Sequence, residues 1–326
     1  MKKRVKAQQD DIATWKNPFI KDMFTADPSA RVFGDRLYVY ASHDISPASN
    51  CCRMDQYHIF STDDMKTWQD YGEIFAAKDV PWGRPEGGYM WAPDCIYRNG
   101  KYYFYYPHPS GAGDDWNKTW KIGVAVSDRP DGGFDPHPEA AGVEGFKGYI
   151  EGMEPFIDPC VFIDDDGQAY IYQGGGGQCF GGKLKENMVE LEGTMQRMVD
   201  TKGSKRKYRG VEYDGLEIFH EGTWVFKRNG IYYLTAPDDH HIKDGGNQLI
   251  YYTSNSPLGP WEYGGVYLEP TGCGTSHGSV VEFKGQWYAF YHNCRLSGGD
   301  GANRSICVDK LYFNDDGSIK MVEQTY

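Results

Sequence analysis

The chain has 326 residues and a formal net charge of −12, which argues against nucleic acid or an anionic membrane surface as a partner because both would be repelled. Aromatic residues make up 15% of the chain and there are 41 glycines, a composition typical of aromatic strands joined by glycine-containing turns. No segment has 18 consecutive apolar residues, and the basic residues 1–11 precede no apolar run, so we expect neither a membrane span nor a signal peptide. A cytoplasmic location is the default expectation, and a periplasmic or secreted one if a leader has been removed.

One strand–turn–strand pattern recurs five times along the chain. In each copy a polar residue precedes a short apolar strand, a turn that contains glycine and an aromatic strand. The copies are DPSARVFGDRLYVYAS from Asp27, DCIYRNGKYYFYY from Asp94, DPCVFIDDDGQAYIYQ from Asp158, EGTWVFKRNGIYYL from Glu221 and HGSVVEFKGQWYAFYHN from His277. Two of the turns are Asn-Gly, which predicts a hairpin because both central residues of a type I′ turn need positive φ.

The spacing of the copies predicts the architecture. Their leading residues lie 56 to 67 positions apart, which leaves room for two further short strands in each unit. Such a period predicts an all-β, five-bladed β-propeller whose blades have four antiparallel strands. We expect residues 1–326 to form this single domain, with residues 1–16 as an N-terminal extension.

The repeat also predicts where functional residues meet. Rotation about one axis would bring the leading residues together, so that four carboxylates and one histidine face a single channel. Carboxylates in one cleft raise each other's pKa and lower the stability of the fold. Such an arrangement is expected at a catalytic or ion-binding centre. The alternative is that the five are ordinary loop residues.

Two features do not fit the repeat. Residues 174–215 include GGGGQCFGG and a basic run from Lys202 to Arg209, which we interpret as a solvated loop rather than a polyanion site. The eight cysteines have no metal-ligand spacing, so most are expected to be buried thiols. The sequence does not explain the adjacent pair Cys51 and Cys52.

Five motifs together carry a family resemblance. ADPS, WAPD, IDPxVFIDDDG, EGxxxxKRNGIYYL and SHGSVVEFKGQWYxFYHN, in this order and at these intervals, resemble glycoside hydrolase family 43. The resemblance extends from about Asn17 to Ile319. It implies a five-bladed propeller that hydrolyses arabinofuranosides or xylosides with inversion, most simply as an exo-acting enzyme on plant cell-wall glycans or oligosaccharides.

The resemblance assigns three catalytic acids. It makes Asp27 the general base, Asp158 the acid that orients and tunes the proton donor, and Glu221 the general acid. Acetal hydrolysis with inversion needs a protonated carboxyl for the leaving oxygen and a carboxylate that activates water, ~6.5–9.5 Å apart. A third negative charge would keep the donor protonated near neutrality. Asp94 receives no catalytic role and is expected to hydrogen-bond a neighbouring strand.

The resemblance also implies sugar and ion contacts. Arg295 corresponds to a basic residue that touches the sugar, and Trp91 is a natural wall for a sugar face. His277 corresponds to a histidine that in many relatives helps to hold a calcium or similar ion, largely through water; the alternative is a hydrogen-bonded axial histidine, because calcium prefers oxygen ligands. The chemistry is expected to need no cofactor. The sugar removed and the oligomeric state are left open.

Two other functions remain open. A retaining five-bladed hydrolase of the fructan-cleaving type would use the first aspartate as a nucleophile. Those enzymes usually have Asn-Asp-Pro and Arg-Asp-Pro motifs, whereas this chain has Ala26-Asp27-Pro28 and Ile157-Asp158-Pro159. A non-catalytic carbohydrate-binding propeller would have no need of all three acids.

Overall fold

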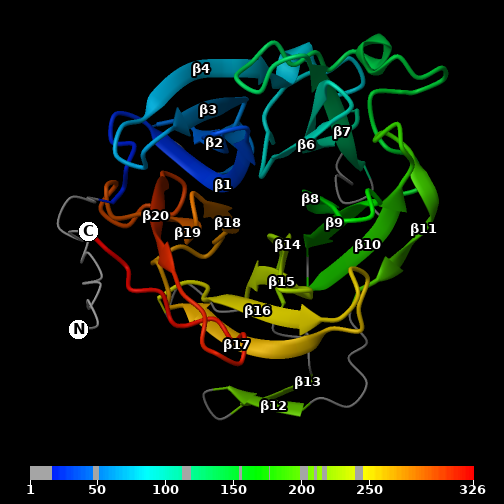
Figure 1. Ribbon diagram of the computed structural model, residues 1–326. Helices are drawn as coiled ribbons and strands as arrows, with labels where there is room; N and C mark the ends of the chain where they lie inside the picture. The colour runs from blue at the N-terminus through cyan, green and yellow to red at the C-terminus, as the bar shows by residue number, and fades with distance from the viewer. Residues whose placement is uncertain are drawn as a thin grey trace, which may run out of the picture.

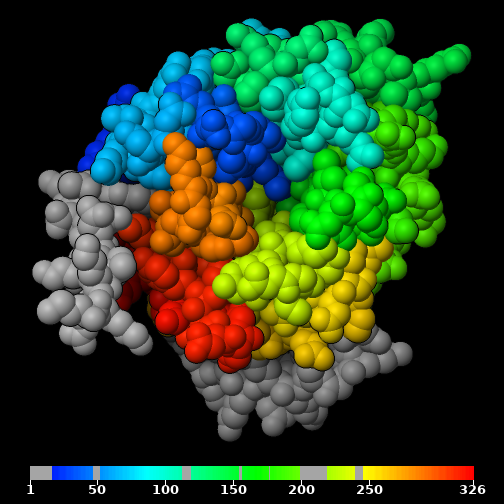
Figure 2. Space-filling view, viewed as in Figure 1, coloured from blue at the N-terminus to red at the C-terminus, as the bar shows by residue number. Residues whose placement is uncertain are grey.

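The computed structural model describes residues 17–46, 51–111, 119–153, 156–175, 177–198, 205–208, 211–214, 219–238 and 245–326. Five antiparallel sheets are arranged around a common centre (Figure 1). Figure 2 shows them following one another in chain order, from blue to red, until the last lies beside the first. The predicted five-bladed β-propeller is confirmed. The expected N-terminal extension, residues 1–16, lies outside the described residues.

Three blades have four strands. Blade I contains β1 (Phe24–Phe33), β2 (Arg36–Asp44), β3 (Gln56–Thr62) and β4 (Gln69–Ala76); blade III contains β8 (Ile157–Ile163), β9 (Ala169–Gly175), β10 (Gln178–Leu184) and β11 (Leu191–Arg197); blade IV contains β14 (Trp224–Arg228), β15 (Ile231–Pro237), β16 (Leu249–Ser254) and β17 (Glu262–Leu268). For these blades the predicted strand number is correct.

Over the described residues, the other two blades have three strands, so four strands per blade was wrong for them. Blade II contains β5 (Asp94–Arg98), β6 (Lys101–Pro109) and β7 (Trp120–Ser127), and blade V contains β18 (Ser279–Phe283), β19 (Gln286–Asn293) and β20 (Ser305–Leu311).

The outer edges of these two blades are covered in other ways. Beside β7 the chain forms only single bridges, at Tyr149 and Asp135. Beside β20 runs the segment that precedes β1: the Phe19 N–H donates to the Ile306 carbonyl at 3.2 Å, and the Asn17 side chain bonds the Val308 N–H and carbonyl at 3.0 Å each. Because the start of the described chain satisfies the edge of blade V, the ring is closed by its two ends.

The stretch at residues 174–215 is partly explained. It supplies β10 and β11 to blade III, and a separate two-stranded sheet of β12 (Lys205–Tyr208) and β13 (Val211–Asp214). Of the basic run, only the four residues of β12 are described; the remainder lies outside the described residues.

Helix is confined to short 3₁₀ turns in the described residues. They are Cys51–Arg53, Ala77–Asp79 and Pro138–Ala141, so the adjacent cysteine pair opens a 3₁₀ turn. No described helix is long and apolar enough to cross a membrane. As expected, most cysteines are buried thiols, namely Cys95, Cys160, Cys179, Cys273, Cys294 and Cys307.

The hairpin turns follow the local sequence. Asn99 and Gly100 have φ of 51° and 84°, and Asn229 and Gly230 have φ of 50° and 79°. Positive φ at both positions is what a type I′ turn requires, and Asn and Gly tolerate it best. These turns fix the register of β5 with β6 and of β14 with β15.

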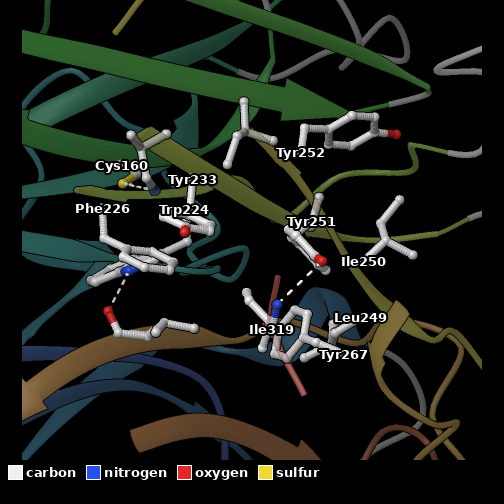
Figure 3. Close-up of a cluster of buried hydrophobic side chains, with 14 of the residues drawn as sticks. Cys160, Trp224, Phe226, Tyr233, Leu249, Ile250, Tyr251, Tyr252, Tyr267 and Ile319 are labelled. Atoms are coloured by element: carbon white, nitrogen blue, oxygen red, sulfur yellow. Dashed lines mark hydrogen bonds between the residues drawn. The ribbon is translucent and has the colours of Figure 1, made fainter. Parts of the chain in front are cut away.

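The core lies between the blades. Tyr57 and Phe104 pack between blades I and II, and their ring centroids are 5.0 Å apart. A larger cluster joins blades III, IV and V (Figure 3), where the Trp224 Nε1–H donates to the Val280 carbonyl at 2.9 Å and the Ile319 N–H donates to the Tyr251 hydroxyl at 3.2 Å. Aromatic side chains suit this position because each buries a large area against the neighbouring blade.

Candidate active site

A pocket of about 100 Å³ lies where the five blades meet. Residues from every blade or the loop before it form its wall: Asp27, Met54, Trp91, Ala92, Ile157, Asp158, Glu221, Thr275, His277 and Arg304. Four of the five leading residues of the repeat are therefore brought together, as the sequence predicted. The fifth, Asp94, is not among the lining residues.

The two Asp-Pro segments share one local geometry. Asp27 and Asp158 have φ of 52° and 55°, and in each case the pairing of the first two strands of the blade shifts across the Asp-Pro step. Aspartate is one of the few non-glycine residues that adopt positive φ readily. A bulge of this kind re-aims a side chain, and here it accompanies the placement of both carboxylates in the pocket.

Asp94 has no such bulge and a different role. Its pairing with Tyr105 continues regularly along β5 and β6, and its buried carboxylate accepts hydrogen bonds from the side chains of Ser29 and Arg31 and from the Val161 N–H, at 2.5–2.9 Å. Asp94 thus connects blades I, II and III. The expected hydrogen-bonding role is confirmed.

Asp27 is buried next to a positive charge. Its Oδ1 accepts a hydrogen bond from Arg304 Nη1 at 2.9 Å, and its Oδ2 accepts one from the Ser42 hydroxyl at 2.8 Å. Its backbone N–H donates to His292 Nδ1 at 3.1 Å. Burial by itself raises the pKa of Asp27, but Arg304, then His292 and His277, and the Ser42 hydrogen bond outweigh it, so the pKa lies below its ordinary value.

Arg304 is held rigidly by a second carboxylate. Its Nε and Nη2 each donate to Asp44 at 3.0 Å, and its backbone N–H donates to Asp44 Oδ2 at 2.7 Å. Nη1 also lies 3.3 Å from Thr275 Oγ1. The guanidinium is buried, and this fork fixes its orientation toward Asp27.

Sequence reasoning missed Arg304 and its partners. Arg304 directly precedes β20 and has no counterpart in the repeat. A single arginine before an apolar strand is a weak signal. Asp44 and Ser42 stand at the end of the strand that follows the first turn, where the repeat marks no functional position.

Glu221 has the opposite electrostatic setting. Its side chain is 20% exposed, and its Oε2 lies 3.8 Å from His220 Nε2. Burial raises the pKa of Glu221, and the negative charge of Asp27 adds to this rise, while His220 and Arg304 oppose it; the net pKa lies above the ordinary value. A carboxyl of this kind holds its proton to higher pH.

Asp158 is hydrogen-bonded to the backbone next to Glu221. Its Oδ2 accepts a hydrogen bond from the Gly222 N–H at 2.8 Å. Burial, followed by the negative charges of Glu221 and Asp27, raises the pKa of Asp158 well above its usual range. Asp158 and Glu221 therefore form a pair of buried acids in which each disfavours ionisation of the other.

Gly222 allows this close approach. It has φ of 63°, and a Cβ atom there would lie 2.7 Å from Pro237 Cδ and 3.2 Å from His277 Nδ1. Any side chain would thus push the segment that carries Glu221 away from its neighbours. The glycine at this position of the EG motif has a packing reason as well as a conformational one.

The remaining predicted residues divide between pocket and surface. Trp91 lines the pocket with its ring 4.6 Å from that of Trp120, and His277 is buried in the same wall. Arg295 does not line the pocket; its guanidinium lies 3.4 Å from the ring centroid of Tyr326. The sugar contact of Arg295 stays a prediction, and Arg304 is the arginine that lines the pocket.

Comparison with known proteins gives one consistent result. The model of "Glycosyl hydrolases family 43" matches residues 15–319. The chain is 35% identical to "Xylosidase/arabinosidase 43A" of Humicola insolens, over 93% of this chain and 98% of that protein, and 34% identical to "Xylosidase/arabinosidase" of Bacteroides ovatus, over 96% and 99%.

A solved structure agrees with these sequence relatives. It is a GH43 beta-xylosidase/alpha-arabinofuranosidase from a compost microbial metagenome, described as a calcium-free form in complex with xylotriose. The TM-score is 0.78 at 32% identity, and the match covers 95% of this chain and 97% of that one.

Proposed function

The chain belongs to glycoside hydrolase family 43, and from that premise we propose that it is an inverting, exo-acting enzyme that removes terminal xylose or arabinofuranose residues from plant cell-wall glycans or oligosaccharides. The observation that carries this proposal is the meeting in one pocket of two carboxyl groups with different surroundings. Asp27 accepts a hydrogen bond from Arg304 Nη1 at 2.9 Å and has a lowered pKa, whereas burial raises the pKa of Glu221. Environments that separate two carboxyl groups in this way suit one for a base and the other for an acid.

The proposed reaction is a single displacement. Glu221 gives its proton to the glycosidic oxygen as the bond from that oxygen to the anomeric carbon breaks. Asp27, ionised beside Arg304, takes a proton from a water molecule whose oxygen forms the new bond to the anomeric carbon from the opposite face. The products are the leaving alcohol and a free sugar of inverted configuration.

Asp158 assists without contacting the breaking bond in this proposal. The negative charge of Glu221 raises the pKa of Asp158, and the same repulsion makes a second ionisation in this pair unfavourable. The hydrogen bond that Asp158 accepts from the Gly222 N–H holds the segment that carries the acid. This is the role that the family resemblance assigns to it.

The pocket wall supports a single terminal sugar as the group removed. Met54, Trp91, Ala92 and Ile157 add apolar surface to the pocket that the acids line, and an aromatic ring suits the apolar face of a pyranose or furanose. A volume of about 100 Å³ is small for an internal stretch of polysaccharide. The relatives named for xylosidase and arabinosidase activity support pentoses as the sugars.

The calcium ion expected near His277 is not part of the proposed reaction. Burial lowers the pKa of His277, which favours a neutral ring that can accept a hydrogen bond from ion-bound water. The nearby carboxylate of Asp27 is already engaged by Arg304 and Ser42, and Arg304 adds a positive charge. These residues do not fit a calcium ion that is coordinated directly by protein oxygens, so we infer that any ion at His277 is held through water.

Two measurements test the proposal. We expect hydrolysis of aryl β-xylosides or aryl α-L-arabinofuranosides, with aryl galactofuranosides as the comparison substrates. Proton NMR of the first-formed sugar, recorded before mutarotation, should show the inverted anomer. A retained anomer would make Asp27 a nucleophile, as in the fructan-cleaving alternative, and no hydrolysis of any of the three would favour a carbohydrate-binding propeller.

A further inference from the structure

A second cluster of ligating side chains lies on blade I. It consists of His43 in β2, His58 in β3 and Glu73 in β4, and one possible ligand atom from each lies within 4.8 Å of the others. Strand pairing explains the meeting: His58 pairs with Ala41 and with Glu73. His43, two residues beyond Ala41, therefore shares their face of the sheet.

Two neighbouring side chains orient these groups. The Nδ1 of His58 is 3.1 Å from Asp70 Oδ1, so an Nδ1–H donates to this carboxylate and Nε2 is left with a lone pair. The Gln56 amide donates to Glu73 Oε2 at 2.6 Å and leaves the other oxygen of that carboxylate. A carboxylate behind a histidine is the arrangement that supports metal-bound imidazoles in proteins.

A ring nitrogen of His43 also points to a ligand at this cluster. Its Nδ1 is buried, and no hydrogen-bond partner for that atom is present among the described residues. The His43 and His58 rings are in T-shaped contact, with centroids 5.3 Å apart.

We propose that His43, His58 and Glu73 bind a divalent transition-metal ion of the zinc type. Two imidazoles and one carboxylate are a ligand set that zinc accepts, with water in the open position. Neighbouring ligands of a tetrahedral zinc ion lie about 3.3 Å apart, so the groups must draw together. Glu73 is exposed, so its carboxylate has room to move inward together with the Gln56 amide that it accepts a hydrogen bond from.

The site is distinct from the catalytic pocket but shares a strand with it. His43 stands between Ser42 and Asp44, whose side chains hold Asp27 and Arg304, and successive side chains of a strand point to opposite faces. The ion cross-links β2, β3 and β4 on the face away from these contacts. It therefore braces the strand that positions the proposed base.

Binding of Zn²⁺ alone tests the proposal without any activity assay. The full chain is freed of metal with a chelator and titrated with Zn²⁺ by calorimetry, with an expected stoichiometry of one ion per chain. Glu73→Gln, an isosteric change at an exposed position, should weaken binding at least tenfold, and His43→Ala should weaken it more. Asp70→Asn should cost about 10–100-fold, the usual effect of losing a supporting carboxylate.

His137→Ala is the matched control. His137 is exposed and its Nδ1 lies 2.7 Å from Asp135, so it offers an imidazole and a carboxylate, but it is not one of the three proposed ligands. This variant should bind Zn²⁺ as the parent does, and substitution by Co²⁺ should give visible bands that Glu73→Gln alters.

Two results would overturn the proposal. One is the absence of saturable Zn²⁺ binding to the parent chain. The other is binding that persists unchanged in Glu73→Gln and in a folded His43→Ala variant, including binding that is lost only in Asp27→Asn, which would place the ion in the catalytic pocket.

Discussion

Replacing Arg304 by glutamine tests whether one buried guanidinium keeps the proposed base ionised. Arg304 Nη1 lies 2.9 Å from Asp27 Oδ1, while Nε and Nη2 hold Asp44 at 3.0 Å each. Burial raises the pKa of Asp27, and Arg304 is the main opposing influence. Without the positive charge, only His292, His277 and the Ser42 hydrogen bond oppose the effect of burial, so the pKa of Asp27 should rise.

The size of the rise follows from the contact distance. Opposite unit charges ~4 Å apart attract by about 4 kcal/mol at an effective dielectric constant of ~20, and about 1.36 kcal/mol corresponds to one pKa unit. The largest expected rise is therefore about 3 units. Because Asp44 shares the guanidinium and partly cancels its charge at Asp27, we expect a rise of ~1–3 units.

The assay is the pH dependence of kcat/KM on an aryl xyloside or arabinofuranoside. A general base works only when ionised, so the acid limb reports the pKa of Asp27 in the free enzyme and should move to higher pH by that amount. Removing Arg304 alone leaves Asp44 buried without its partner, at a cost of about 3–5 kcal/mol.

Two further variants separate charge from folding. In Arg304→Gln/Asp44→Asn both charges are removed, which protects the fold. In Arg304→Lys the charge is kept but the fork is lost, so its acid limb should stay near that of the parent. An acid limb that is unmoved in the folded double variant would refute the electrostatic role given to Arg304.

Three further predictions follow from the same contacts. Glu221→Gln should lose about 100- to 10,000-fold in kcat/KM on substrates with poor leaving groups and far less on activated aryl glycosides. Asp27→Asn should lose activity equally on both kinds of substrate. Equal losses for the two variants across leaving groups would contradict the assignment. Asp158→Asn removes the second carboxyl of the buried pair and with it the repulsion that opposes ionisation of Glu221, so the pKa of Glu221 should fall and the alkaline limb of the pH profile should move to lower pH; a fixed alkaline limb would count against this tuning. Asp94→Asn leaves the Arg31 guanidinium buried without its counter-charge and should lower the free energy of unfolding by about 3–5 kcal/mol in urea titrations, and a loss below about 1 kcal/mol would show that the connection between blades is dispensable.

The hairpins and the number of blades could be predicted from the sequence because both depend on patterns of neighbouring residues. Asn99-Gly100 and Asn229-Gly230 adopt the positive φ values that their side chains tolerate, and the apolar and aromatic runs on either side pair as expected. The repeat of these hairpins also placed Asp27, Asp158 and Glu221 in equivalent positions, and the structure brings them to one pocket.

The number of strands in each blade depended on contacts between distant segments. Blade V has three strands because the segment before β1 covers β20, with the Phe19 N–H bound to the Ile306 carbonyl. A short-range pattern cannot reveal that the chain's beginning completes its last blade. The different roles of Asp94 and Asp27 likewise depended on a bulge that is present in β1 and absent from β5.

What the sequence by itself determined was therefore the repeated unit and the identity of the acids; the tertiary structure alone decided their surroundings. Arg304 and Asp27 are 277 positions apart, and His43, His58 and Glu73 come from three different strands. Turn conformation depends on the dihedral preferences of adjacent residues, which are local. The pKa of a carboxyl depends on burial and on nearby charges, and only closure of the ring sets both.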